Sequence, residues 1–299
     1  MTRTRTFVAA SALLVAGCAA GCAAGCAAAP RDAVPTADLP RGDGRVGGSA
    51  RWPDASVLAL SATSPRDAFV LTSDGVSRLV LSPIGLARGA EPTLGAEDLS
   101  APRDLDATNG QDLYVADGSR VLRYSAEGRL VQTLDVPSVD ALLVSTAPTA
   151  PPGEAVAVAS GAEGTVYVAE ATRGVVQVWR DGALSDVFGG LGRPVSLATR
   201  GRTLHVADRV SRAVRVLDET GRELRVLRHE ALTDVISVSV GADRVVVLAP
   251  EAVVIFSAEG DVDRVVPVSG GAALLDAALV GGRLLVATPG GVHDLGRVD

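Results

Sequence analysis

A short strand-like sequence recurs along this chain, and it constrains the fold more than any other feature. Leu-Tyr-Val-Ala-Asp at residues 113–117 returns as Val-Tyr-Val-Ala-Glu at 166–170 and as Leu-His-Val-Ala-Asp at 204–208. Looser copies begin at residues 68, 245 and 284. About six copies spaced by about 40 residues indicate the blades of a propeller or the units of a solenoid.

The residues between these copies favour propeller blades. In the second repeat, four apolar runs are separated by turn dipeptides that begin at Asn109, Asp117 and Glu127. The runs occupy residues 103–107, 112–116, 120–124 and 130–136. Glycine-containing dipeptides between short apolar runs are hairpin signals. Four antiparallel strands in about 40 residues make one blade, so we expect an all-β protein.

The second repeat resembles an NHL-type repeat. The resemblance rests on Pro102 before the first strand, on residues 113–117 and 120–124, and on the turn at Glu127-Gly128. It extends over residues 52–299 and weakens in the first, fifth and sixth repeats, where Thr72, Ala249 and Thr288 replace the acid. It implies a six-bladed β-propeller of four-stranded antiparallel blades. A seventh blade is the alternative, but the spacing between residues 113 and 166 exceeds the usual one by only about a dozen residues, too few for another blade of about 40.

The last repeat ends at Asp299, one strand short of a blade. We expect residues 44–52 to supply the missing outer strand beside the C-terminal strand. An N-terminal strand would thus close the ring, which removes free sheet edges that invite aggregation.

The wider gap holds an apolar run at residues 139–144 and a proline-rich run at 145–154. We expect the apolar run to be the innermost strand of the third blade. The proline-rich run belongs outside the sheet, because proline cannot donate to a strand ladder. Rim loops often carry function, although an insertion that contacts nothing explains this run equally well.

The first residues predict export and lipidation. Arg3 and Arg5 precede a short apolar segment that is typical of a signal peptide. The sequence that ends at Cys18 resembles the lipobox of bacterial lipoproteins, which implies that Cys18 is lipidated. We therefore expect a signal peptide at 1–17, a disordered tether at 18–43 and the propeller at 44–299. Cleavage near Ala28, with secretion of a soluble protein, is the alternative.

The same residues indicate where the protein resides and what it contacts. Ala19 after the lipidated cysteine resembles a signal for outer-membrane sorting, so we expect a membrane-anchored protein that faces the periplasm. The formal net charge of -7 and the lack of a basic stripe argue against nucleic acid as a partner. We expect a monomeric propeller that contacts the membrane through its lipid and binds a protein of the envelope.

Two sets of acids are candidates for chemistry. Asp117, Glu170 and Asp208 share one repeat position, where a carboxylate is expected to accept backbone N–H groups of a turn. A second set is expected near the start of each innermost strand, facing the central channel. Its members are Asp104, Asp106, Asp140, Asp234 and Asp276.

Acids that converge on the channel would suit Ca²⁺ or a similar hard cation. Gluconolactonase-like propellers hold a metal there with carboxylate and Asn side chains. The single Asn of this chain, Asn109, lies in a turn, which departs from that pattern. The metal question stays open at this point, and no cofactor is expected.

The sequence shows no catalytic constellation. Its three histidines, His205, His229 and His293, share no spacing, and no Gly-x-Ser-x-Gly motif is present. We therefore expect a non-catalytic lipoprotein of the cell envelope whose propeller binds or scaffolds a protein or another ligand. The alternatives are a cation-dependent hydrolase of lactonase type and a purely structural envelope protein.

The lipidation prediction is tested by the substitution Cys18→Ala. It removes the thiol that would be acylated, so the protein should leave the membrane fraction, because the acyl chains supply the membrane affinity. Cys22→Ala is the matched control and should leave fractionation unchanged. Retention of the Cys18→Ala protein on membranes would contradict the assignment.

Overall fold

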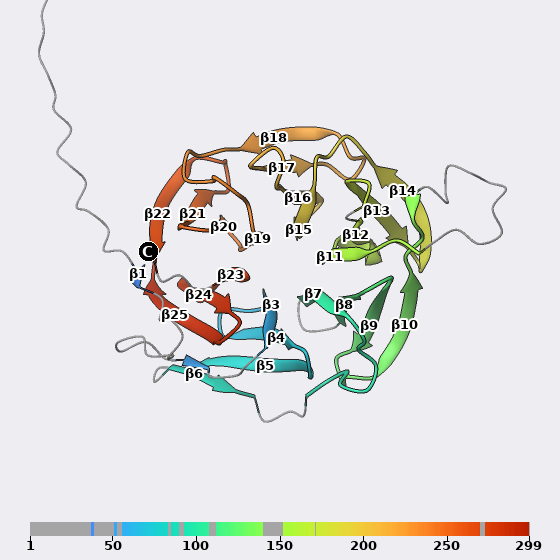
Figure 1. The fold of residues 1–299 in the computed structure, drawn as a ribbon, viewed down its shortest axis with the longest axis horizontal. Helices are drawn as coiled ribbons and strands as arrows, with labels where there is room; N and C mark the ends of the chain where they lie inside the picture. The colour runs from blue at the N-terminus through green and yellow to red at the C-terminus, as the bar shows by residue number, and fades with distance from the viewer. Residues whose placement is uncertain are drawn as a thin grey trace, which may run out of the picture. The chain divides into compact units, whose positions relative to one another are not determined.

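Valine, leucine and alanine build the strands of this protein, because β-branched and aliphatic side chains pack well on a pleated surface. The computed structural model describes residues 37–38, 51–52, 56–82, 85–89, 93–107, 112–139, 152–170, 172–269 and 273–298. All of them belong to one unit, Val34–Asp299. This unit is a ring of six antiparallel blades, as expected from the repeats (Figure 1).

Each blade runs from an innermost strand at the channel to an outermost strand at the rim (Figure 1). Blade 1 contains β3 (Val57–Ala62), β4 (Asp67–Thr72), β5 (Gly75–Ser82) and β6 (Gly85–Arg88). Blade 2 contains β7 (Pro102–Ala107), β8 (Asp112–Asp117), β9 (Arg120–Ser125) and β10 (Leu130–Asp135). Blade 3 contains β11 (Ala155–Ser160), β12 (Val166–Glu170), β13 (Val175–Arg180) and β14 (Ala183–Phe188).

The other three blades follow the same order. Blade 4 contains β15 (Pro194–Arg200), β16 (Thr203–Asp208), β17 (Ala213–Leu217) and β18 (Glu223–Leu227). Blade 5 contains β19 (Ser237–Val240), β20 (Arg244–Ala249), β21 (Ala252–Ser257) and β22 (Val262–Ser269). Blade 6 contains β23 (Asp276–Val280), β24 (Arg283–Thr288) and β25 (Gly291–Arg297).

The chain's N-terminal part completes blade 6. The short strand β2 (Arg51–Trp52) lies antiparallel to β25, with Arg51 opposite His293 and Trp52 opposite Val292. This confirms that an N-terminal strand closes the ring. A second strand, β1 (Ala37–Asp38), pairs in parallel with Val268 and Ser269 of β22 and makes blade 5 five-stranded. It lies within the segment that the sequence predicts as a tether.

The innermost strand of blade 3 differs from the expectation. It is β11, which follows the proline-rich run and pairs with β12 from Ala155 to Ser160. The expected strand at 139–144 does not fill this place, and residues 140–144 lie outside the described residues. The alternating alanine and valine of residues 155–158 suit an innermost strand, because small side chains fit beside the channel.

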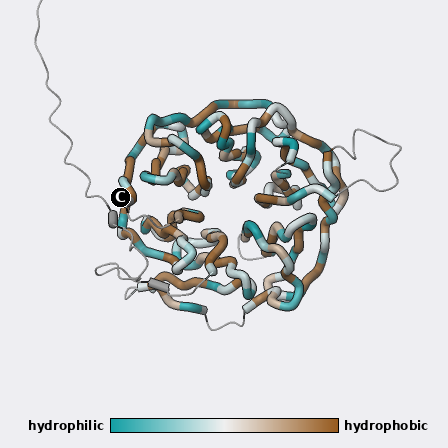
Figure 2. The backbone as a smooth tube through the Cα atoms, in the orientation of Figure 1, coloured by the Kyte–Doolittle hydropathy of each residue, from teal (hydrophilic) through white to brown (hydrophobic). Residues whose placement is uncertain are grey.

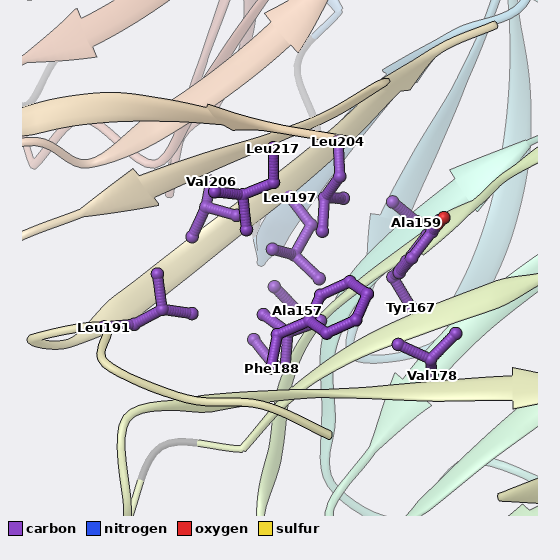
Figure 3. Close-up of a cluster of buried hydrophobic side chains, with 12 residues drawn as sticks. Ala157, Ala159, Tyr167, Val178, Phe188, Leu191, Leu197, Leu204, Val206 and Leu217 are labelled. Atoms are coloured by element: carbon purple, nitrogen blue, oxygen red, sulfur yellow. The ribbon is translucent and has the colours of Figure 1, made fainter. Parts of the chain in front are cut away.

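Hydrophobic clusters fill the space between neighbouring blades. Tyr167 and Phe188 of blade 3, with ring centroids 6.3 Å apart, lie in one buried cluster with Leu204 of blade 4 (Figure 3). Hydrophobic and hydrophilic stretches are both found around the ring (Figure 2), and some strands, such as β20, are buried over nearly their whole length. Burying one such side chain stabilises the fold by about 1.5–3 kcal/mol. Since every blade covers its two neighbours, the core requires a closed ring.

Helix contributes little to the described residues. Helical residues there are the three-residue 3₁₀ turn Ala162–Gly164 and Val139, which lies at the end of a described stretch. Among the described residues, no helix has the length and apolar character needed to cross a membrane.

Ring closure is tested by deleting residues 44–52. Loss of β2 leaves β25 as a free edge, so the melting temperature should fall by several degrees, since each kcal/mol corresponds to about 2–4 °C for a protein of this size. Deletion of residues 22–30, which is equally long, is the control. Equal melting temperatures for the two deletions would count against closure by β2.

Candidate functional site

The innermost strands are sheet edges, and their backbone N–H groups need partners from outside their own blade. At four junctions between blades, side chains of a neighbouring innermost strand supply these partners. The Ser61 hydroxyl of blade 1 accepts from Ala107 N–H of blade 2 at 3.2 Å. The Ser196 hydroxyl of blade 4 accepts from Val238 N–H of blade 5 at 3.1 Å. We call this set of bonds the channel belt.

Two of the sequence-predicted acids join blade 2 to blade 3 in the channel belt. Asp104 and Asp106 both lie on β7 and point to the same side of the strand, because they are two residues apart. The Asp104 carboxylate accepts from Val158 N–H at 3.0 Å. The Asp106 carboxylate accepts from Ser160 N–H at 2.9 Å and also from the Ser160 hydroxyl.

Asp276 makes the corresponding bond between blade 6 and blade 1. One of its carboxylate oxygens accepts from Leu60 N–H at 2.9 Å, and the other accepts from the N–H of Ala277. Asp276 on β23 and Asp104 on β7 occupy the same register, each opposite the residue that precedes the end of the second strand. The carboxylates are therefore part of the ring's internal hydrogen bonding.

Burial changes the acidity of these groups. Burial raises the pKa of Asp276 to about 6. Burial also raises the pKa of Asp104 well above its ordinary value, and the charge of Asp276 adds to this increase. The pKa of Asp106 is raised by burial too, although hydrogen bonds from Ser160 oppose the shift. The Asp276 side chain is 8% exposed, whereas Asp104 and Asp106 remain partly accessible.

The remaining two predicted channel acids do not join this set. Asp140 lies outside the described residues. Asp234 precedes β19 instead of lying on it, and its carboxylate pairs with Arg209 at 2.9 Å. On β19, Ser237 holds the register that Asp104 and Asp276 hold on their strands, because it lies opposite Leu248, the residue before the end of β20. Asp234 was expected near the start of the innermost strand of blade 5, but Ser237, three residues later, is the first residue of that strand.

The described residues contain no group of three or more His, Cys, Asp or Glu side chains placed to hold a metal ion. Within that part of the chain, the channel acids bind backbone N–H groups of neighbouring blades. Carboxylates used in this way suit cohesion and proton binding.

In blades 2 and 4, the acids of the repeated pentapeptide accept backbone N–H groups of the segment that leads into the innermost strand of the same blade. Asp117 accepts from the backbone N–H groups of Ser100 and Ala101, and Asp208 accepts from those of Gly192 and Arg193. Burial alone would raise the pKa of Asp117, but these N–H groups and Arg120 outweigh it and lower the pKa. In the turns that follow their strands, Asp208 also accepts from Val210 N–H at 3.1 Å and Glu170 accepts from Thr172 N–H at 3.2 Å, which confirms the turn-cap interpretation for these two acids. Asp117 instead caps the segment that enters β7.

A feature that the sequence reasoning missed is a groove between blades 2 and 3, with a volume of about 710 Å³. Its wall residues include Tyr114, Arg123, Val131, Leu134, Val166 and Trp179. Arg123 binds Asp112 at 2.8 Å, and its guanidinium lies 5.9 Å from the centre of the Tyr114 ring. We call this feature the blade 2–3 groove.

The scarcity of aromatic residues in the sequence makes each of them a candidate for a binding surface. Aromatic residues make up only 3% of the chain, with two Trp and three Tyr. One Trp and one Tyr line the blade 2–3 groove, and Tyr167 lines a smaller pocket of about 240 Å³ between blades 3 and 4. Such side chains combine an apolar body with a polar tip and are frequent in binding sites.

No family model matches this chain, and no curated protein matches it. Solved structures do. The WD40 β-propeller domain of Doa1 is 14% identical, with a TM-score of 0.59, over 83% of this chain and 95% of that domain. A Bacteroides caccae protein of unknown function is 14% identical, with a TM-score of 0.52, over 75% of this chain and 84% of that one.

Kuenenia stuttgartiensis hydrazine synthase is 17% identical, with a TM-score of 0.51, over 64% of this chain and 56% of that one. At these identities the three likenesses show the β-propeller fold alone.

The pKa of Asp276 predicts a pH dependence of stability. The folded state holds the proton up to about pH 6, whereas the unfolded chain releases it near 3.8. Between these values the folded state binds more protons, so its stability falls as the pH rises through this window and is level above it. Asp276→Asn removes this loss, which amounts to about 2–3 kcal/mol.

Urea unfolding of the wild type and of Asp276→Asn at pH 4 and pH 7.5 measures this difference. Asp218→Asn is the control, because the pKa of Asp218 is lowered to about 2 and the side chain stays ionised across this range. Parallel pH profiles of the wild type and Asp276→Asn would contradict the assignment.

Proposed function

We propose that this protein is an exported, lipid-anchored lipoprotein whose NHL-like propeller acts as a non-catalytic binding or scaffolding module at the cell envelope. The blade 2–3 groove carries the proposal, because it combines aromatic side chains with polar groups that lack partners. Its volume lies in the range of 300–1,000 Å³ that is typical of binding sites, and polar and apolar side chains line it together. The lipobox-like sequence at Cys18 supports the anchor.

The channel belt supports the non-catalytic part of the proposal. Asp104, Asp106 and Asp276 each accept a backbone N–H of the next blade, so removing any of them leaves a buried donor unsatisfied. A group with such a structural duty is poorly suited to binding and releasing substrate in every turnover.

A cation-dependent hydrolase of lactonase type is the second candidate. The observation that favours it is the raised pKa of Asp276 and Asp104, because acids with perturbed pKa values occur often at active sites. Structural acids have perturbed pKa values as well. Burial explains these shifts without catalysis, and the hydrogen bonds of the channel belt oppose them.

The proposed location is the periplasmic side of the outer membrane. The propeller would act as a monomer, because its ring is closed by its own N-terminal strand and needs no second chain. A chain with a tether and a closed ring suits the presentation of binding surfaces to a protein of the envelope.

The proposal is tested by recovering the lipidated protein with a C-terminal tag from detergent-solubilised envelopes after mild cross-linking. A partner protein should be recovered in an amount comparable to that of the tagged protein. It should be absent when residues 1–43 alone carry the tag, because the propeller supplies the binding surface. The same preparation is assayed for bound metal and for lactone and ester turnover. A stoichiometric cation with turnover that chelation abolishes would replace the binding module by the hydrolase.

A further inference from the structure

We infer that the blade 2–3 groove binds an extended peptide segment that inserts a carboxamide side chain, Asn or Gln, while its backbone lies along the outer edge of β10. The inference rests on the proposed binding function and names the ligand class of that site. Four observations carry it: the wall of the groove, its unpartnered donors, its charge and the exposed edge beside it.

The groove is built by both blades. Blade 2 contributes Tyr114 and Leu134, and blade 3 contributes Val166 and Trp179, and these four residues also pack in one buried cluster. At the outer end, the flexible amide end of Gln132 lies against Gly182. The wall of the groove is therefore held mainly by the core between the blades.

Two donor groups in this wall lack partners. The residue Trp179 is only 7% exposed, and its indole N–H is buried without an acceptor. The Nε–H of Arg123 is also buried without an acceptor. A buried donor without an acceptor is unfavourable, and a ligand that brings an acceptor removes this penalty. Because both donor atoms are buried, a ligand reaches them only when neighbouring side chains shift, and such a ligand gains most when it offers hydrogen-bond acceptors.

The charges of the groove select a neutral acceptor. Arg123 is already neutralised by Asp112 at 2.8 Å, and Asp181 adds a further carboxylate to the lining. The three charges sum to −1, so an anionic side chain is repelled. A carboxamide meets both demands, because its oxygen accepts from the unpartnered donors and its NH₂ group donates to a carboxylate.

The edge beside the groove fits a peptide backbone. β10 is the outermost strand of blade 2, so one row of its N–H and C=O groups has no strand partner among the described residues. Its Leu130 and Val131 are 41% and 54% exposed. In blade 5 the outermost strand β22 already pairs with a further strand, β1. Outer edges of this ring are thus geometrically able to receive an added strand.

The probes are synthetic nine-residue peptides of alternating Thr and Val with a central Asn, Ala or Asp. Binding is followed by tryptophan fluorescence in a Trp52→Phe background, where Trp179 is the single tryptophan. The Asn peptide should bind about tenfold more tightly than the Ala peptide, and the Asp peptide should bind most weakly. Because aromatic grooves also bind sugars, a soluble tetramer of N-acetylglucosamine serves as the competing glycan probe.

Two variants locate the site, with affinity measured by calorimetry. Val131→Glu places a charge on the β10 edge and should weaken all the peptides by about tenfold or more. Leu224→Glu on β18 is the matched control, because Leu224 is a comparably exposed residue on an outermost strand and should leave binding unchanged. Asp181→Asn should remove the discrimination against the Asp peptide, and Asn tolerates the positive φ of this exposed turn residue.

Three results would overturn the inference. They are equal affinities of the Asn and Ala peptides, unchanged binding by Val131→Glu, and binding of the glycan in place of the peptides. Recovery of the envelope partner by the Val131→Glu protein, together with failure of the peptides, would refute this groove while leaving the binding function intact.

Discussion

The channel belt is the interaction on which the rest of this structure depends. Six sheets meet at their innermost strands, and each of these strands would expose unpaired N–H groups to the channel. Asp104, Asp106 and Asp276, together with serines such as Ser196, accept those N–H groups from the next blade. Cohesion between blades therefore combines directional bonds at the channel with apolar packing farther out.

The belt also explains the acid chemistry of the channel. Carboxylates that bind edge N–H groups between packed strands lose hydration, and burial raises their pKa values. The same acids would be candidates for metal binding or catalysis in an open channel. Here their hydrogen bonds join neighbouring blades. The groove between blades 2 and 3, in contrast, is lined by residues whose buried polar groups lack partners among the described residues.

Most of the architecture could be predicted because it depends on local sequence patterns. The number of copies of the pentapeptide that ends at Asp117 predicts the number of blades, and the glycine-containing turns predict the hairpins. The missing last strand predicts closure by residues near Trp52, which β2 confirms. The candidate site could be predicted only in part. Asp234 was expected on the innermost strand of blade 5, but it precedes that strand by three residues. The innermost strand of blade 3 begins at Ala155, and both differences arise because register depends on cross-strand pairing.

The sequence by itself determined the all-β class, the six repeats, and the turn caps at Glu170 and Asp208. Periodicity and turn chemistry act between residues close in the chain, so they can be read directly. Only the tertiary structure decided that Asp104 meets Val158, that Asp276 meets Leu60, and that Tyr114 and Trp179 share one groove. Those partners lie on different blades, and their contacts arise from the curvature of the closed ring.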